Sequence, residues 1–186
     1  MSIDHISDEF GYWFAGFVDG EGCFYAGMQN PYVDKRGYAH NVNLQIFFNL
    51  TLRADDLPLL ETIKKTLGCG RLNVKKYQNR KSPHGGKPQA VYNVNANIEH
   101  RQVIVPLFDK YKLKSKKARD FKTWKQIVLR GKGVGGRYPD RNWGEIRRLV
   151  AKLRSERAYD YDPILAAEIE AQHTPTPQWE QQGLFQ

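Results

Sequence analysis

The sequence predicts an α+β domain in which a helix is followed by two strands, a second helix, two more strands and a third helix, an αββαββα order. Residues 54–67 and 99–111 space their large apolar side chains three and four apart, as helices with one buried face do. Four segments instead alternate apolar with polar side chains, the two-residue period of a half-buried β-strand: residues 23–30, 41–51, 71–77 and 89–96. Residues 8–20 supply the first helix.

Two more helices, at residues 116–130 and 142–157, follow this core and carry apolar stripes of their own. We expect them to belong to the same domain, which would then comprise residues 1–158. The remaining residues, 159–186, are acidic and contain Pro and Gln, so a loosely ordered tail is expected there.

The first helix is unusual because residues 12–18 carry no charged side chain, a pattern typical of a segment that is buried on all sides. Small residues stand four apart in it, at Gly11 and Ala15 and again at Gly16 and Gly20. Small side chains at this spacing let another backbone approach closely. We therefore expect this helix to pack against a partner helix.

Two carboxylates, Asp19 and Glu21, follow the apolar run, and Gly20 and Gly22 are expected to end the helix beside them. A pair of carboxylates at the end of a buried helix needs a positive partner, and a metal ion is the simplest one. The sequence thus predicts a cation site where this helix meets the first strand.

The outward faces of the predicted strands are rich in amides and cations. Residues 41–51 place Asn43, Gln45 and Asn49 opposite their apolar side chains, with no Lys or Glu among them. Asn and Gln both donate and accept hydrogen bonds, which suits the edge of adenine in a major groove. An ordinary solvated sheet face is the alternative, but it more often carries charge or Thr. Because the other strands repeat the pattern, a binding sheet is favoured.

The charge of the chain points to a polyanionic partner. There are 29 Lys and Arg against 20 Asp and Glu, a net charge of +9, and all the cations precede residue 158. Residues 110–119 include six cations, and residues 78–88 form a second basic stretch. Nucleic acid is the first candidate, and a surface that is merely soluble is the alternative. A membrane surface is disfavoured because no basic amphipathic helix or lipidation signal is found.

Two cysteines, Cys23 and Cys69, give neither a disulfide framework nor a metal-binding spacing. We therefore expect a reducing intracellular compartment, either a bacterial cytoplasm or an organelle. The first ten residues lack the basic and apolar regions of a secretory signal, and no stretch is long and apolar enough to span a membrane. No small-molecule cofactor is expected.

Residues 14–22 read FAGFVDGEG and resemble the LAGLIDADG motif of homing endonucleases. The order of helices and strands after the motif matches that family, as do the glycines at Gly68 and Gly70 and the Lys112-Leu113-Lys114 turn. The similarity covers residues 8–130 and looks closest to the single-motif, homodimeric branch. It implies a curved antiparallel β-sheet that forms a DNA-binding saddle.

The resemblance implies a sequence-specific endonuclease that cuts a long, pseudo-palindromic double-stranded DNA site by Mg²⁺-dependent phosphodiester hydrolysis, with Mn²⁺ as a possible substitute. In this family two motif helices pack at a two-fold axis, and each delivers one acid to a scissile phosphate. That acid falls on Glu21, the carbonyl of Gly20 helps to hold the metal, and Lys114 matches the active-site lysine. One motif per chain implies a homodimer, whose interface would include Tyr12, Gly16, Phe17 and Gly20.

Asp19 is interpreted as a helix-end hydrogen-bonding residue rather than a ligand. Homodimeric relatives place a Gln and an Arg in the active-site solvent shell where this chain has Leu52 and Asp56, and Arg53 is a nearby candidate to replace them. Outward residues of the strands, the basic loop and the lysine run are expected to contact DNA: Tyr25, Gln29, Asn43, Gln45, Asn49, Arg71, Asn73, Lys75, Lys81, Asn93, Asn95 and Lys116.

Three alternatives stay open. The same fold assists intron splicing in RNA maturases, which do not use the carboxylates, so intron RNA is a possible partner. A non-catalytic DNA-binding regulator on this scaffold would nick no target in Mg²⁺, and no added helix-turn-helix supports it. The plainest alternative is a basic α+β protein whose core helix ends in glycine.

Overall fold

The computed structural model describes residues 2–29, 32–33, 35–40, 42–75, 87–131 and 143–157. In these ranges α1 (Asp8–Glu21) runs directly into β1 (Gly22–Gln29), and a short ribbon of β2 (Tyr32–Val33) and β3 (Ala39–His40) precedes β4 (Asn43–Arg53). A 3₁₀ turn, η1 (Ala54–Asp56), leads into α2 (Leu57–Leu67), β5 (Arg71–Lys75) and β6 (Gln89–Val94). The next helical segment comprises α3 (Asn97–Glu99), η2 (His100–Ile104) and α4 (Val105–Lys110), followed by α5 (Lys117–Arg130) and α6 (Trp143–Arg157).

Lys81 in the predicted basic loop and the tail from residue 159 lie outside the described residues.

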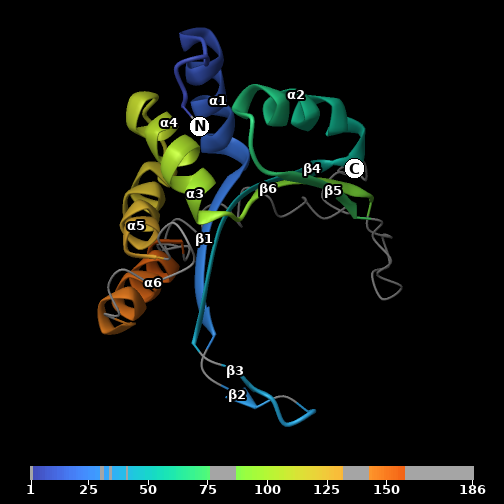
Figure 1. Ribbon diagram of the computed structural model, residues 1–186. Helices are drawn as coiled ribbons and strands as arrows, with labels where there is room; N and C mark the ends of the chain where they lie inside the picture. The colour runs from blue at the N-terminus through green and yellow to red at the C-terminus, as the bar shows by residue number, and fades with distance from the viewer. Residues whose placement is uncertain are drawn as a thin grey trace, which may run out of the picture.

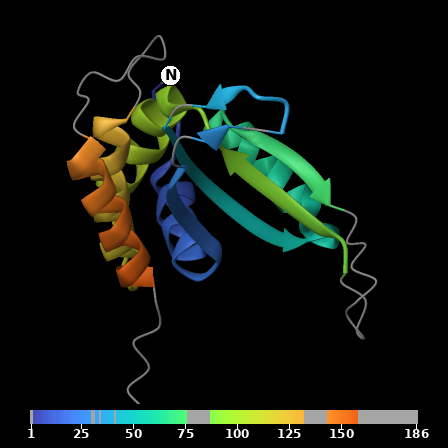
Figure 2. The same ribbon diagram turned by 90° about the horizontal axis from the view of Figure 1, so that it is seen from below.

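Four strands form an antiparallel sheet in the order β1-β4-β6-β5. The sheet is curved, with α2 over one face and with α5 and α6 beside β1 (Figure 1). Seen from below, the strands lie in front of α1 and α2, and no described helix covers the face turned to the viewer (Figure 2). This arrangement confirms the predicted α+β fold and its αββαββα order.

The strands and helices meet in an aromatic core. Alternate residues of β1 and β4 point toward the helices, so that Phe24 and Phe48 meet Phe14 of α1 and Phe108 of α4 with ring centroids 5.2 to 6.4 Å apart. Trp124 of α5 closes this cluster and donates from its indole N–H to a carbonyl of β1 at 3.1 Å. Burying each such side chain contributes about 2 kcal/mol. This core fixes the C-terminal end of α1 against the sheet.

Two helix boundaries differ from those predicted. α1 continues through Gly20 to Glu21, because the N–H of Gly22 still donates to the carbonyl of Val18. The helix predicted at residues 99–111 begins two residues earlier and contains a π-turn, η2, just before Pro106. Proline has no N–H to offer the carbonyl four residues back, which favours a widened turn there. None of the helices in the described ranges is long and apolar enough to cross a membrane.

The prediction that α1 is buried on all sides is wrong for the single chain. Its sheet-facing residues are buried, but Tyr12 is 67% exposed and Trp13 is 44% exposed. Side-chain atoms added at Gly16 or Gly20 would meet nothing within 4 Å. Only one face of α1 rests on the sheet, and no other element of the described ranges covers the opposite face. The single chain therefore exposes an apolar helix face.

Candidate functional site

The C-terminal end of α1 presents carbonyl groups that a helix cannot satisfy by itself. Lys117, in the first turn of α5, donates from Nζ to the carbonyl of Gly20 at 2.5 Å and to that of Asp19 at 3.1 Å. A cation suits this position because the helix dipole is negative there and the last turn of α1 contains no basic residue. Burial lowers the pKa of Lys117, and the carboxylates of Glu21 and Asp19 oppose this shift.

The carboxylate of Asp19 joins α1 to the turn before α5. It accepts hydrogen bonds from the backbone N–H of Lys114 at 2.7 Å, from that of Ser115 at 3.1 Å, and from the Ser115 hydroxyl at 2.7 Å. The same hydroxyl accepts the N–H of Lys117 at 3.2 Å, and Ser115 stands just before Lys116, the N-cap residue of α5. This geometry supports the interpretation of Asp19 as a helix-end hydrogen-bonding residue, and it positions Lys117.

Glu21 is the last residue of α1, and its side chain is exposed. The predicted active-site lysine, Lys114, touches this region through its backbone N–H while its side chain points to solvent. Sequence reasoning missed Lys117, whose ammonium is the one that reaches the Gly20 carbonyl. Residues 110–119 contain six cations, so composition alone does not single out Lys117. The only signal in the sequence was its position two residues after Ser115, in the first turn of the predicted helix.

The donor atoms at this helix end fit a divalent metal ion. The Gly20 carbonyl and the Glu21 carboxylate are hard oxygen ligands of the kind that Mg²⁺ prefers, and the carbonyls already attract an ammonium group. They provide only part of a coordination sphere, because no group of three or more His, Cys, Asp or Glu gathers among the described residues. The other ligands would be water, phosphate oxygens or groups that lie outside the described residues.

A pocket of about 360 Å³ adjoins this helix end. Its walls include Cys23 of β1, Ser115, Lys117 and, at the end of α6, Arg157. The Arg157 guanidinium donates from Nη2 to Sγ of Cys23 at 3.1 Å. The pocket therefore joins the end of α1 to the outer face of β1, where the sheet begins.

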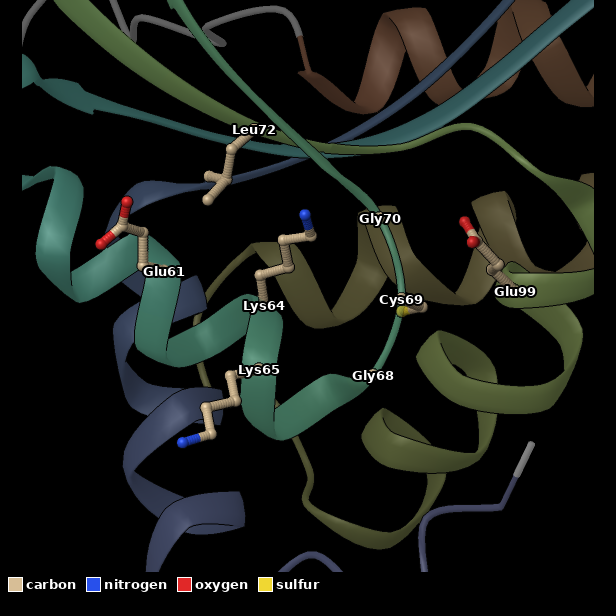
Figure 3. A pocket seen from close by; sticks show the side chains of 8 residues that line it. All are labelled: Glu61, Lys64, Lys65, Gly68, Cys69, Gly70, Leu72 and Glu99. Atoms are coloured by element: carbon tan, nitrogen blue, oxygen red, sulfur yellow. The ribbon is translucent and has the colours of Figure 1, made fainter.

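A larger hollow, of about 590 Å³, lies between the C-terminal end of α2 and the start of α3 (Figure 3). Its side chains carry both charges, with Lys64 and Lys65 from α2 and Glu99 from α3. Burial raises the pKa of the Cys69 thiol in its wall, which makes the thiol a poor nucleophile. Because α2 covers this side of the sheet, the hollow is separate from the cation site.

The strand register places the predicted contact residues on one face of the sheet. Cys23 pairs with Asn49, Asn49 with Asn93 and Asn93 with Arg71, which makes one row across four strands. Alternate residues of a strand share a face, so the other predicted strand residues lie there too: Tyr25, Gln29, Asn43, Gln45, Asn73 and Lys75. This is the uncovered face of Figure 2. Asn95 is exposed just beyond the end of β6.

Sequence reasoning missed two outward residues, Thr51 and Gln89. Thr51 stands in a row with Val91 and Asn73, and Gln89 pairs with Lys75. Alternation within one strand was the only available signal for them, because their neighbours depend on a register that the sequence does not give.

The structure does not bring Arg53 to the end of α1. Its guanidinium pairs with Asp55, with Nε 3.1 Å from Oδ1 and Nη2 2.5 Å from Oδ2. In the register, Arg53 lies three residues beyond Leu50, the partner of Gly22. Leu52 packs against the core and Asp56 stands before α2, so neither supplies a polar group to the helix end.

The exposed face of α1 contains all four predicted interface residues: Tyr12, Gly16, Phe17 and Gly20. Trp13 stacks on Phe17 with centroids 5.4 Å apart, and at 100° per residue these two rings lie on one side of the glycines while the ring of Tyr12 lies on the other. The glycines stand four residues apart and leave a shallow seam between these rings. Such a seam allows close approach of a second helix.

Residues 14–128 match the family model described as LAGLIDADG endonuclease. The probable intron-encoded endonuclease Cox1-I1b of Schizosaccharomyces pombe is 28% identical over 117 residues, which is 63% of this chain and 26% of that protein. The I-LtrWI LAGLIDADG homing endonuclease bound to target DNA matches with a TM-score of 0.63 at 25% identity, covering 82% of this chain and 47% of its own. The I-SmaMI LAGLIDADG homing endonuclease bound to cleaved DNA matches with a TM-score of 0.60 at 26% identity, covering 80% of this chain and 45% of its own.

This chain spans between 19% and 26% of the length of its curated relatives, and less than half of either solved structure. The region matched by the family model begins within the motif of α1 and ends within α5. It therefore includes the helix end with Asp19, Gly20 and Glu21, all four strands of the sheet, and Lys117. The chain belongs to the LAGLIDADG endonuclease family.

Proposed function

We propose that this chain is a DNA endonuclease that hydrolyses both strands of a long, pseudo-palindromic duplex site with a divalent metal ion. One observation carries the proposal: the Glu21 carboxylate and the Gly20 carbonyl stand at the end of α1, where the uncovered amide and cationic face of the sheet begins. A duplex bound on that face would lie with its backbone next to these oxygens.

Glu21 and the Gly20 carbonyl would hold the metal ion, Mg²⁺ or in its place Mn²⁺. Such an ion neutralises phosphate charge and lowers the pKa of its bound water. The chain's own residues hold and orient the reactants. Lys117 provides a positive charge within reach of the phosphate, and Asp19 fixes the turn from which Lys114 and Lys117 project. The exposed Lys114 side chain would contact the water molecules around the phosphate.

We further propose that two copies act together. One chain supplies one acid and covers less than half of the solved structures to which it is similar. Its α1 exposes Tyr12, Trp13 and two glycines with open space above them. A second copy of the same helix would bury this face, and the two Glu21 side chains would then serve one strand each.

The outer sheet face would read the sequence of the DNA, and each good contact with a base edge is worth about 1–3 kcal/mol of discrimination. Two solved relatives are described as bound to DNA, which supports duplex DNA as the partner. Intron RNA is the competing partner, because RNA maturases share this fold. The free thiols of Cys23 and Cys69 suit a reducing compartment inside a cell.

Selection of cleaved members from a plasmid library with a randomised insert tests this proposal. We expect a restricted set of sequences to be linearised in Mg²⁺ and none in EDTA. Glu21→Gln should bind a selected site with nearly the wild-type Kd and leave it uncut, because the substitution removes one carboxylate and keeps the shape.

No cutting of any member with Mg²⁺ or Mn²⁺ would overturn the endonuclease proposal. Cutting by Glu21→Gln at the wild-type rate would overturn the assignment of the acid. Tight binding of an intron RNA together with an uncut DNA library would instead favour a role in splicing.

A further inference from the structure

Helix α6 begins at Trp143, beyond residue 128, where the region matched by the family model ends. It nevertheless packs against α5 and β1 through Ile146, Val150 and Leu153, which are buried. β1 is one of the two edge strands of the sheet. The helix therefore lies along an edge of the proposed DNA-binding sheet (Figure 1).

The charges of α6 are divided between its two flanks. At 100° per residue, Arg147 and Arg154 lie on one flank, where they and Met28 of β1 line a pocket of about 310 Å³. The two acidic residues lie on the other flank and are paired there, Glu145 with Arg130 at 2.8 Å and Glu156 with Lys152 at 3.8 Å. The charged residues on the flank beside β1 are therefore all basic.

Arg157 connects this basic flank to the outer face of the sheet. Its Nη2 donates to Sγ of Cys23 at 3.1 Å, and its guanidinium carbon is 6.0 Å from the centroid of the Tyr25 ring. Cys23 and Tyr25 both belong to the uncovered face. The end of α6 thus reaches around the edge of β1 onto the surface that carries the amide residues.

The spacing of these arginines follows β1. Ten residues of helix separate Arg147 from Arg157, a rise of about 15 Å, and β1 covers about 17 Å from Cys23 to Met28. One end of the arginine row contacts Cys23 and Tyr25, and the other lies beside Met28. The row therefore runs along nearly the whole edge strand.

We propose that α6 extends the DNA-binding surface, with Arg147, Arg154 and Arg157 binding phosphates of the strand that passes the edge of β1. This inference rests on the proposed function. Arg suits the task because its planar guanidinium makes paired, charge-assisted hydrogen bonds to phosphate oxygens. Contacts of this kind add affinity on any sequence and position the duplex, whereas the sheet selects its sequence.

The salt dependence of binding to a duplex of arbitrary sequence tests the proposal. Each lost phosphate contact reduces the slope of log K against log[salt] by about 0.9. Arg154→Gln/Arg157→Gln should therefore lower the slope by about 2 between 50 and 200 mM KCl, measured by fluorescence anisotropy. Arg148→Gln/Lys152→Gln removes the same charge from the opposite flank of α6 and should leave the slope at the wild-type value.

Equal slopes for the two double variants would overturn the role of α6, whether both match the wild type or both fall together. Wild-type protein that binds no duplex DNA would instead overturn the proposed function itself. If the Arg154/Arg157 variant fails to give the wild-type circular dichroism spectrum, the single substitution Arg154→Gln at an exposed position replaces it. That variant should lower the slope by about 1, and an unchanged slope would again contradict the proposal.

Discussion

Two lysines are candidates for the cation at the end of α1. Lys114 matches a landmark of the family, but only its backbone N–H contacts Asp19. Lys117 brings its ammonium to the Gly20 carbonyl at 2.5 Å. The difference arises because Asp19 and Ser115 hold the start of α5, and the first turn of that helix faces the end of α1.

We expect Lys117→Met to lower the single-turnover rate of DNA cleavage by about 100-fold, the usual effect of removing one group that stabilises developing charge. Lys114→Met should lower the rate less, because the exposed Lys114 side chain makes no hydrogen bond to these carbonyls in the described part of the chain. Lys117→Arg keeps the charge and serves as the matched control, with an intermediate rate. A wild-type rate for Lys117→Met would show that this ammonium takes no part in cleavage.

His100 is a buried titratable residue with a structural role. Its ring donates from Nε2 to the Val94 carbonyl at 2.8 Å, while Nδ1 has no hydrogen-bond partner among the described residues. Trp124 stands edge-on to the ring, with centroids 5.0 Å apart. Burial lowers the pKa of His100 from 6.5 to about 4, and the bond to Val94 opposes this only in part.

The lowered pKa of His100 predicts acid sensitivity of the fold. The unfolded chain binds the proton more readily, so the stability due to neutral His100 is complete above pH 6.5 and is lost as the pH falls toward 4. The loss should amount to about 3 kcal/mol. Urea unfolding at pH 7, 5.5 and 4 measures it, with His100→Gln as the control. A wild-type pH dependence no steeper than that of the variant would contradict this origin.

At the level of whole elements, α1 uses its glycines for two different contacts. An atom added at Gly11 would stand 2.3 Å from the Tyr111 ring, so this glycine permits packing within the chain. Gly16 faces open space. One face of the helix thus serves the core and the other is available to a second copy.

Gly16→Leu should abolish dimer formation and DNA cleavage together while the chain keeps its fold, because Leu is a better helix former than Gly and meets no neighbour. Gly11→Ala should instead destabilise the fold itself, lowering the free energy of unfolding by about 1–3 kcal/mol, because the added methyl group overpacks against Tyr111. Sedimentation equilibrium and circular dichroism separate these effects. A dimeric Gly16→Leu protein would place the interface elsewhere.

The sequence reveals the elements better than their mutual positions. Alternation in residues 41–51 predicted both a strand and its amide face, because the period of two is local. The register is set by pairing between distant segments, so the place of Thr51 and of Gln89 had to be seen in the structure. An uncharged run such as residues 12–18 indicates burial, but it does not say whether the cover is the same chain or another copy.

The lysine whose ammonium contacts the end of α1 could not be identified from the sequence for a similar reason, and the catalytic role of Lys114 stays a prediction. Which cation of residues 110–119 meets α1 depends on where α5 begins, and the side chain of Asp19 decides this across more than ninety residues of sequence. The assignments of the acid to Glu21 and of the metal-binding carbonyl to Gly20 also stay predictions, and they rest on a motif that is continuous in the chain and ends one helix.

At the scale of the whole molecule, apolar and polar surfaces are separated by the sheet. Helices cover one face (Figure 2). The amide and cationic residues of the strands occupy the other face, and α6 adds arginines along the edge. The two Glu21 side chains of a pair would stand where both outer faces meet. Under the proposed function each copy would cut one strand, and a double-strand break would need both copies.

A dimer with a single intact Glu21 therefore tests the central claim most directly. Wild-type and Glu21→Gln chains carrying different tags can be co-expressed, and mixed dimers can be purified through both tags. On a supercoiled plasmid with a selected target, mixed dimers should give nicked circles, wild-type dimers linear DNA, and Glu21→Gln dimers no product. Linear DNA formed by mixed dimers at the wild-type rate, or by a wild-type protein that remains a monomer on the DNA, would contradict one acid for each strand.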